Sequence, residues 1–77
     1  MEDLIRKILT EKIKDSSIAV EGGEAKYTVK VVSDIFKDKT VIERHKIIYA
    51  ALDSYIKSGE IHALTIKSLT MNESNKT

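Results

Sequence analysis

Apolar side chains recur at two different spacings along the chain, and these spacings distinguish helices from strands. Five aliphatic residues within 2–14 lie three or four positions apart: Leu4, Ile5, Ile8, Leu9 and Ile13. That spacing predicts an amphipathic helix over residues 2–14. Residues 26–33 alternate instead, with Tyr27, Val29 and Val31 on one side, which predicts a strand with one buried face.

A shorter apolar segment precedes this strand and predicts a partner for it. Ile18 and Val20 flank Ala19, which is typical of a short strand, and Gly22-Gly23 follows as a turn signal. Two strands around such a turn predict a hairpin, which we expect to have a loop longer than two residues.

The second half of the chain predicts a long helix and a third strand. Thr40 and Glu43 have the spacing of a capping box, and Gly59 is placed as a stop after Lys57. The helix between them has one broad predicted core face: Val41, His45, Ile48, Leu52, Tyr55 and Ile56. Residues 61–69 form the third predicted strand, and Phe36 is expected to fill the core despite its polar neighbours.

The order of elements is therefore helix, strand, strand, helix, strand. Helices on one face of a small sheet make a two-layer α+β sandwich. A crossover through the long helix would make strands two and three parallel, giving a mixed three-stranded sheet. We expect a single domain over residues 1–71 and a flexible polar tail over 72–77.

Composition narrows the function classes. The 77 residues carry 13 Lys and Arg against 12 Asp and Glu, a net charge of +1, which argues against binding nucleic acid by charge alone. There is no cysteine, so disulfides and thiolate ligands from this chain are excluded. The acidic start and the lack of a long apolar run predict an intracellular, cytoplasmic chain with no membrane partner.

The candidate chemistry is sparse and favours a protein that is not an enzyme. Ser, His and Asp occur, but in no nucleophile motif. His62 has two interpretations, a strand-end histidine bonded to backbone or a metal ligand near the edge of the sheet. His45 has three: it packs or hydrogen-bonds beneath the long helix, it joins Arg44 and Lys46 in a small basic stripe for phosphate, or it lies on a solvated helix face, which is the favoured interpretation.

One family shares these segments in this order. The shared segments are Tyr-Thr-Val-Lys-Val-Val-Ser-Asp over 27–34, then Phe36, then Arg-His-Lys-Ile-Ile-Tyr-Ala over 44–50, then Ile-His-Ala-Leu-Thr-Ile-Lys over 61–67. With these residues the chain resembles the BolA-like family over about residues 2–71. The resemblance implies a fold like the class II KH domain, in the order αββααβ, with a short helical turn around 35–39.

The resemblance also implies a partner and a cargo. BolA-like proteins bind monothiol glutaredoxins, and the pair can share a 2Fe–2S cluster in iron–sulfur trafficking or iron sensing. The glutaredoxin side supplies a cysteine and a glutathione thiol, and the histidine of the Ile-His-Ala-Leu motif, here His62, supplies a cluster ligand. Many members carry a second Cys or His between the first two strands, but residues 21–26 contain neither. This departure favours a complex with one histidine ligand, or one that docks without a cluster.

The family's other proposed role is nucleic-acid binding, through a helix-turn-helix-like region at residues 35–57. Candidate DNA contacts there are Lys37, Lys39, Arg44 and Lys46. The Gly-x-x-Gly loop with which KH domains clamp a nucleic-acid backbone is absent. Nucleic-acid regulation is therefore the alternative hypothesis.

The leading hypothesis is a non-enzymatic adaptor for a monothiol glutaredoxin. His62 would be the cluster ligand, and Arg44, Lys46 and Ala63 would contact the partner. The chain alone would hold no cofactor and would be a monomer or a weak homodimer. His45 is expected to hold the long helix to the sheet.

Overall fold

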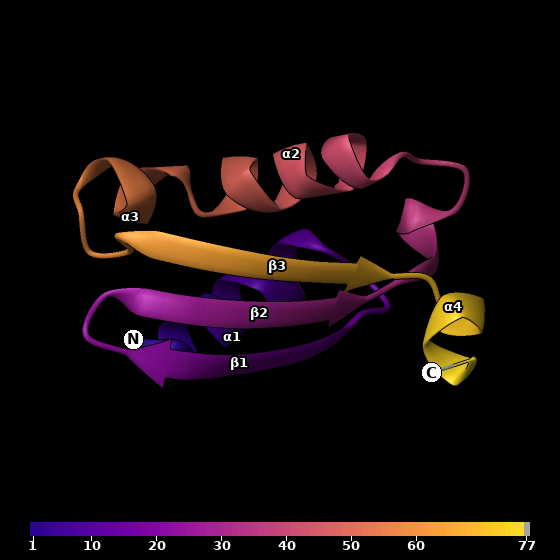
Figure 1. Cartoon of the computed structure of the whole chain (residues 1–77), viewed down its shortest axis with the longest axis horizontal. Helices are drawn as coiled ribbons and strands as arrows, with labels where there is room; N and C mark the ends of the chain where they lie inside the picture. The colour runs from indigo at the N-terminus through magenta and orange to yellow at the C-terminus, as the bar shows by residue number, and fades with distance from the viewer. Residues whose placement is uncertain (77) are drawn as a thin grey trace.

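A computed structural model describes residues 1–76 and shows one sheet with helices packed on one of its faces (Figure 1). The elements in chain order are α1 (Glu2–Lys12), β1 (Ser17–Gly23), β2 (Lys26–Val32), the 3₁₀ turn η1 (Asp34–Phe36), α2 (Val41–Ala51), α3 (Asp53–Lys57), β3 (Ala63–Leu69) and α4 (Met71–Asn75). The predicted α+β architecture is confirmed, including the helical turn before the long helix.

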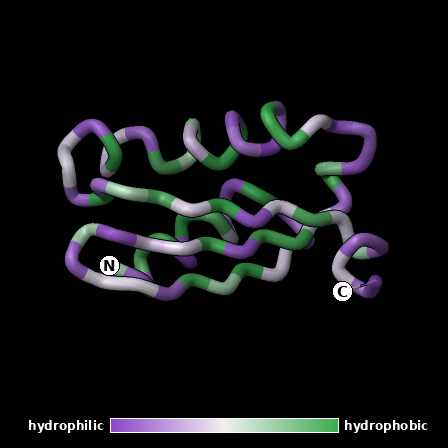
Figure 2. Tube along the Cα trace, in the orientation of Figure 1, coloured by the Kyte–Doolittle hydropathy of each residue, from purple (hydrophilic) through white to green (hydrophobic). Residues whose placement is uncertain are grey.

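The sheet has the predicted mixed topology, with β2 at its centre. β1 pairs with β2 in antiparallel fashion, and β2 pairs with β3 in parallel. The alternation in β2 has the predicted consequence, because Tyr27, Val29 and Val31 are all buried. Hydropathy alternates along the strands accordingly (Figure 2).

The core lies between this face of the sheet and the helices. Phe36 is fully buried, as expected, and so are Ile5 and Leu9 of α1, Ile48 of α2 and Leu52, which directly follows α2. Thr40 and Glu43 form the predicted capping box on α2, with hydrogen bonds in both directions.

The hairpin turn lies two residues later than predicted. Gly22 and Gly23 belong to β1 and pair with Tyr27 and Lys26, which leaves only Glu24 and Ala25 as the loop. The expected longer loop was therefore wrong. Gly22 has a φ of +130°, and a Cβ at this position would lie 2.2 Å from the Lys26 carbonyl oxygen. The glycine is needed where the two strands approach most closely, not at the turn itself.

The long predicted helix is interrupted at Leu52, which separates α2 from α3. Val41, expected on the core face, is 59% exposed because it lies in the first turn of α2, at the end of the helix. Gly59 has a φ of +84° after the last turn of α3, in agreement with its predicted role as a helix stop.

The expected flexible tail over 72–77 was wrong for residues 72–75, and Thr77 lies outside the described residues. Residues 71–75 form α4, which begins with a capping box between Thr70 and Glu73. The Met71 amide also donates to Asp34 Oδ1 at 3.0 Å. The folded unit therefore extends beyond the predicted limit at residue 71.

Candidate cluster-ligand and partner-binding site

His62 lies at the junction between α3 and β3, one residue before the strand begins. Its amide donates to the Ala25 carbonyl at 2.7 Å, and the amide of Ala63 donates to the same oxygen at 3.0 Å. On the other side, the Ile61 amide donates to the Tyr55 carbonyl at 3.0 Å, and the Ile61 side chain is buried. The peptide at His62 is therefore held both by the hairpin turn and by α3.

The side chain of His62 is free although its backbone is fixed. The residue is exposed, and its imidazole makes no hydrogen bond or ion pair to any residue in 1–76. The backbone interpretation of His62 therefore accounts for its amide but not for its ring. A neutral imidazole in this position can donate a nitrogen lone pair to a metal.

A metal at His62 would need ligands from another molecule. Within residues 1–76, no three His, Cys, Asp or Glu side chains are grouped so that they could hold a metal ion. The nearest strand position across from Ala63 is Lys26, and the turn itself is Glu24-Ala25. A protonated lysine is no metal ligand. His62 could therefore supply one ligand of a cluster shared with another molecule, but residues 1–76 do not supply a complete set of ligands.

The predicted partner contacts differ in how they are placed. Lys46 is exposed on α2, and Ala63 is exposed at the start of β3. Arg44, expected beside Lys46 on a solvated face of the long helix, is 7% exposed. That expectation was wrong, because α2 turns Arg44 inward toward β3 and α4.

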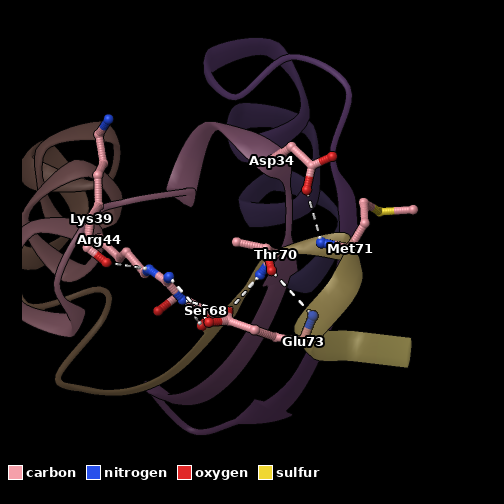
Figure 3. A network of polar contacts seen from close by, with 7 residues as sticks. All are labelled: Asp34, Lys39, Arg44, Ser68, Thr70, Met71 and Glu73. Atoms are coloured by element: carbon pink, nitrogen blue, oxygen red, sulfur yellow. Dashed lines mark hydrogen bonds and ion pairs between the residues drawn. The ribbon is translucent and has the colours of Figure 1, made fainter. Parts of the chain in front are cut away.

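Arg44 instead connects three parts of the fold (Figure 3). Its Nε donates to the Lys39 carbonyl at 3.0 Å, and Nη1 donates to the Ser68 carbonyl at 3.2 Å. Nη1 and Nη2 meet the two oxygens of Glu73 at 2.7 and 3.3 Å. The guanidinium also lies 5.8 Å from the centre of the Phe36 ring.

Glu73 is the anion that neutralises this buried cation. The hydrogen bond from Arg44 and that from the Thr70 amide lower the pKa of Glu73 from its usual value to about 2. Sequence reasoning missed the pair because 29 residues separate its members. The one available signal was the Thr-x-x-Glu spacing at 70–73, which marks the start of a helix rather than a tail.

The residues of the nucleic-acid alternative are only partly available. Lys37, Lys39 and Lys46 are exposed, but the guanidinium of Arg44 is already engaged. The region 35–57 contains a 3₁₀ turn of three residues and the helices α2 and α3, so its first element is too short for a helix-turn-helix.

His45 lies half-buried on α2, where its ring makes no hydrogen bond to residues 1–76. The expected hydrogen bond beneath the helix is absent from that range. Arg44, not His45, makes the polar connection between α2 and the sheet.

Known proteins share both the sequence and the arrangement. A family model described as BolA-like protein matches residues 4–73. A protein of Acinetobacter guillouiae, named for the rpoN-murA intergenic region, is 38% identical over 72 residues, which cover 94% of this chain and 87% of the relative.

Two solved structures show that the likeness extends through the whole fold. A BolA homologue from Coxiella burnetii superposes with a TM-score of 0.85 at 28% identity, covering 97% of this chain and 96% of that one. The BolA domain of SufE1 from Arabidopsis thaliana superposes with a TM-score of 0.83 at 32% identity, covering 94% and 93%. The chain belongs to the BolA-like protein family.

Proposed function

We propose that this protein is a non-enzymatic adaptor that docks a monothiol glutaredoxin and supplies His62 as one ligand of a shared 2Fe–2S cluster. The observation that carries the proposal is the contrast at His62 between a fixed peptide and a free, exposed imidazole. The exposed ring uses neither nitrogen within residues 1–76, so both are available to an external group.

The family supports a role in iron–sulfur biology. A BolA domain forms part of SufE1 in Arabidopsis thaliana, and that domain shares this fold. The resemblance in the Ile-His-Ala-Leu segment supports the choice of His62 as the ligand.

The chemistry of the site supports sharing rather than storage. The chain contributes one imidazole, and a cysteine of the partner with a glutathione thiol would supply two more of the four terminal ligands that a 2Fe–2S cluster takes. An imidazole in place of a thiolate raises the reduction potential of a 2Fe–2S cluster. Protonation of the imidazole would break its bond to iron, which links cluster release to pH.

Docking would use the exposed residues among those predicted to contact the partner. Lys46 and Ala63 remain in the proposed contact surface, and Lys46 offers a cation to acidic groups of the partner. Arg44 stabilises the fold behind that surface and is not assigned a direct contact.

The test is a titration of the protein into a monothiol glutaredoxin that carries its cluster, followed by visible circular dichroism and complex size. We expect a new cluster spectrum with the wild type and with His45→Ala, the matched control, and no new spectrum with His62→Ala. A complex that forms with an unchanged spectrum would remove the ligand role and leave docking. Absence of any complex would overturn the adaptor proposal.

A DNA-binding assay distinguishes the nucleic-acid alternative from the adaptor proposal. It predicts that binding of a labelled DNA duplex weakens steeply as salt rises, because phosphate contacts release counterions. Lys37→Glu with Lys39→Glu should then weaken that binding, while His62→Ala should not change it.

A further inference from the structure

One face of the sheet carries no helix in the part of the chain that the structure describes. In Figure 1, α1 lies behind the strands, and no element lies in front of them. We call this front surface the open face. Strand pairing arranges it in three rows across β1, β2 and β3: Gly23, Lys26 and Ala63; Glu21, Thr28 and Thr65; Ala19, Lys30 and Lys67. The next row, Ser17, Val32 and Leu69, lies at the end of the sheet, where Val32 is buried, and is not counted as part of the open face.

The open face is predominantly basic although the whole chain is nearly neutral. Lys26, Lys30 and Lys67 lie on it, and Glu21 is the one carboxylate among its strand residues. None of these three lysines forms an ion pair or a side-chain hydrogen bond within residues 1–76. Their charges are therefore balanced by solvent and not by the fold.

Two of the lysines are placed unfavourably for stability. Lys30 and Lys67 are direct partners in the β2–β3 register, and like charges in directly opposed positions destabilise a sheet. Ala19, on the other side of Lys30, is too small to screen that charge. A local rule broken without compensation in the fold is typical of a functional surface.

The groups around the lysine pair can bind carboxylates. Thr28 and Thr65 are also direct partners in the next row, so two hydroxyls adjoin the two ammonium groups. A shallow hollow of about 210 Å³ opens beside them and is lined by Ala19, Val20, Glu21, Thr28 and Lys30. The small side chain of Ala19 leaves room there for a side chain from another molecule.

We infer that the open face docks an acidic segment of a protein partner, whose carboxylates pair with Lys30, Lys67 and Lys26. Charge complementarity carries this assignment, and the Thr28 and Thr65 hydroxyls add hydrogen-bond donors to the same carboxylates. The inference requires neither a cluster nor the imidazole of His62, although the open face shares Ala63, the sheet partner of Lys26, with the proposed glutaredoxin contact surface.

A protein segment fits the open face better than a nucleic acid does. The strand residues of this face include no aromatic side chain on which a base could stack, because Tyr27 points into the core. Glu21 would also repel a phosphate backbone, whereas a protein segment can place a cation or an amide beside it. These two features decide between the classes of polyanion.

The experiment titrates a hexaglutamate peptide into the ¹⁵N-labelled protein at low salt and follows amide shifts by NMR. We expect shifts in β2 and β3 around Thr28, Lys30 and Lys67. The variant Lys30→Thr with Lys67→Thr should bind at least tenfold more weakly. The matched control, Lys37→Thr with Lys39→Thr, removes the same charge elsewhere and should bind as the wild type does.

A second measurement, urea unfolding, tests whether the Lys30–Lys67 pair lowers stability. It also shows whether weaker peptide binding could come from a loss of folding. Lys67→Thr should unfold at a higher urea concentration than the wild type, because it removes repulsion and adds a good strand former. A lower midpoint would contradict the argument.

Equal losses in the two double variants would overturn the inference, as would the absence of shifts on the open face. Tighter binding of a single-stranded oligonucleotide through the same lysines would overturn the choice of a protein partner. His62→Ala should bind the peptide normally, so failure of the glutaredoxin proposal and failure of this inference are separate results.

Discussion

The guanidinium of Arg44 is a buried cation whose acceptors come from the loop before α2, from β3 and from α4. It bonds the carbonyls of Lys39 and Ser68 and both oxygens of Glu73. Only a planar fork of several N–H groups can reach these acceptors together, so lysine is no substitute. Arg44, which was predicted to contact a partner, instead connects α2 to β3 and α4.

Substitution of Arg44 should therefore reduce stability more than a typical surface substitution. We expect Arg44→Lys to lower the free energy of unfolding by about 2 kcal/mol, because acceptors lose charged hydrogen bonds that a lysine cannot replace. Urea unfolding followed by circular dichroism measures this. Lys46→Arg, a change on the exposed face of α2, should alter it by less than about 0.5 kcal/mol. Equal effects of the two would show that the Arg44 contacts contribute nothing.

The sequence reveals single residues unevenly. Tyr27, Val29 and Val31 were assigned to the core correctly because alternation is a local pattern. Arg44 was not, because its environment depends on Ser68 and Glu73, which are more than twenty residues away along the chain. The position of His62 before a strand could be predicted from the sequence, whereas the free ring and the hydrogen-bonded backbone depend on the folded structure.

At the scale of elements, the β1–β2 hairpin shows how a turn signal can mislead. Gly-Gly predicted the turn, but the chain turns at Glu24 and Ala25, with φ angles of 52° and 67°. Left-handed backbone costs a residue with a side chain about 1–2 kcal/mol. The glycines instead serve the strand, where Gly22 lets the Lys26 carbonyl approach. The order of the strands and of the two longer helices remains predictable, because it depends on periodicity rather than on turn chemistry.

This turn can be improved by a local change. We expect Glu24→Asn with Ala25→Gly to raise the free energy of unfolding by about 1 kcal/mol, because Asn-Gly favours two successive positive φ angles. Thermal unfolding gives the measurement. Gly59→Ala should act in the opposite direction, since it places a side chain at a φ of 84° with no contact to gain. A destabilised Asn-Gly variant would contradict this view of the turn.

At the scale of the whole molecule, α4 closes the end of the sheet through one carboxylate. Glu73 caps its own helix through the Thr70 amide and neutralises Arg44. Because its folded pKa is about 2, below its usual value of 4.5, it stabilises the fold fully above pH 4.5. That contribution is lost as the pH falls from about 4.5 toward 2.

The wild type should therefore lose stability through this acid range more steeply than Glu73→Gln does. The comparison uses urea midpoints measured at several pH values from about 7 to about 3, a range that includes the titration of an ordinary carboxyl group. Glu60→Gln is the control, because Glu60 is exposed and its side chain makes no ion pair within residues 1–76. Parallel curves for Glu73→Gln and the wild type would exclude the Arg44–Glu73 pair as their cause.

The hydrogen bonds that fix the peptide at His62 affect the entropy of binding at its side chain. Fixing the backbone of one residue costs about 1–2 kcal/mol, and at His62 that cost is met when the chain folds, through the bonds to Ala25 and Tyr55. A group that binds the imidazole then has only the two side-chain torsions left to order. A group that binds the imidazole weakly can therefore bind and dissociate without any rearrangement of the fold. The proposed sharing of a cluster between two proteins requires this behaviour.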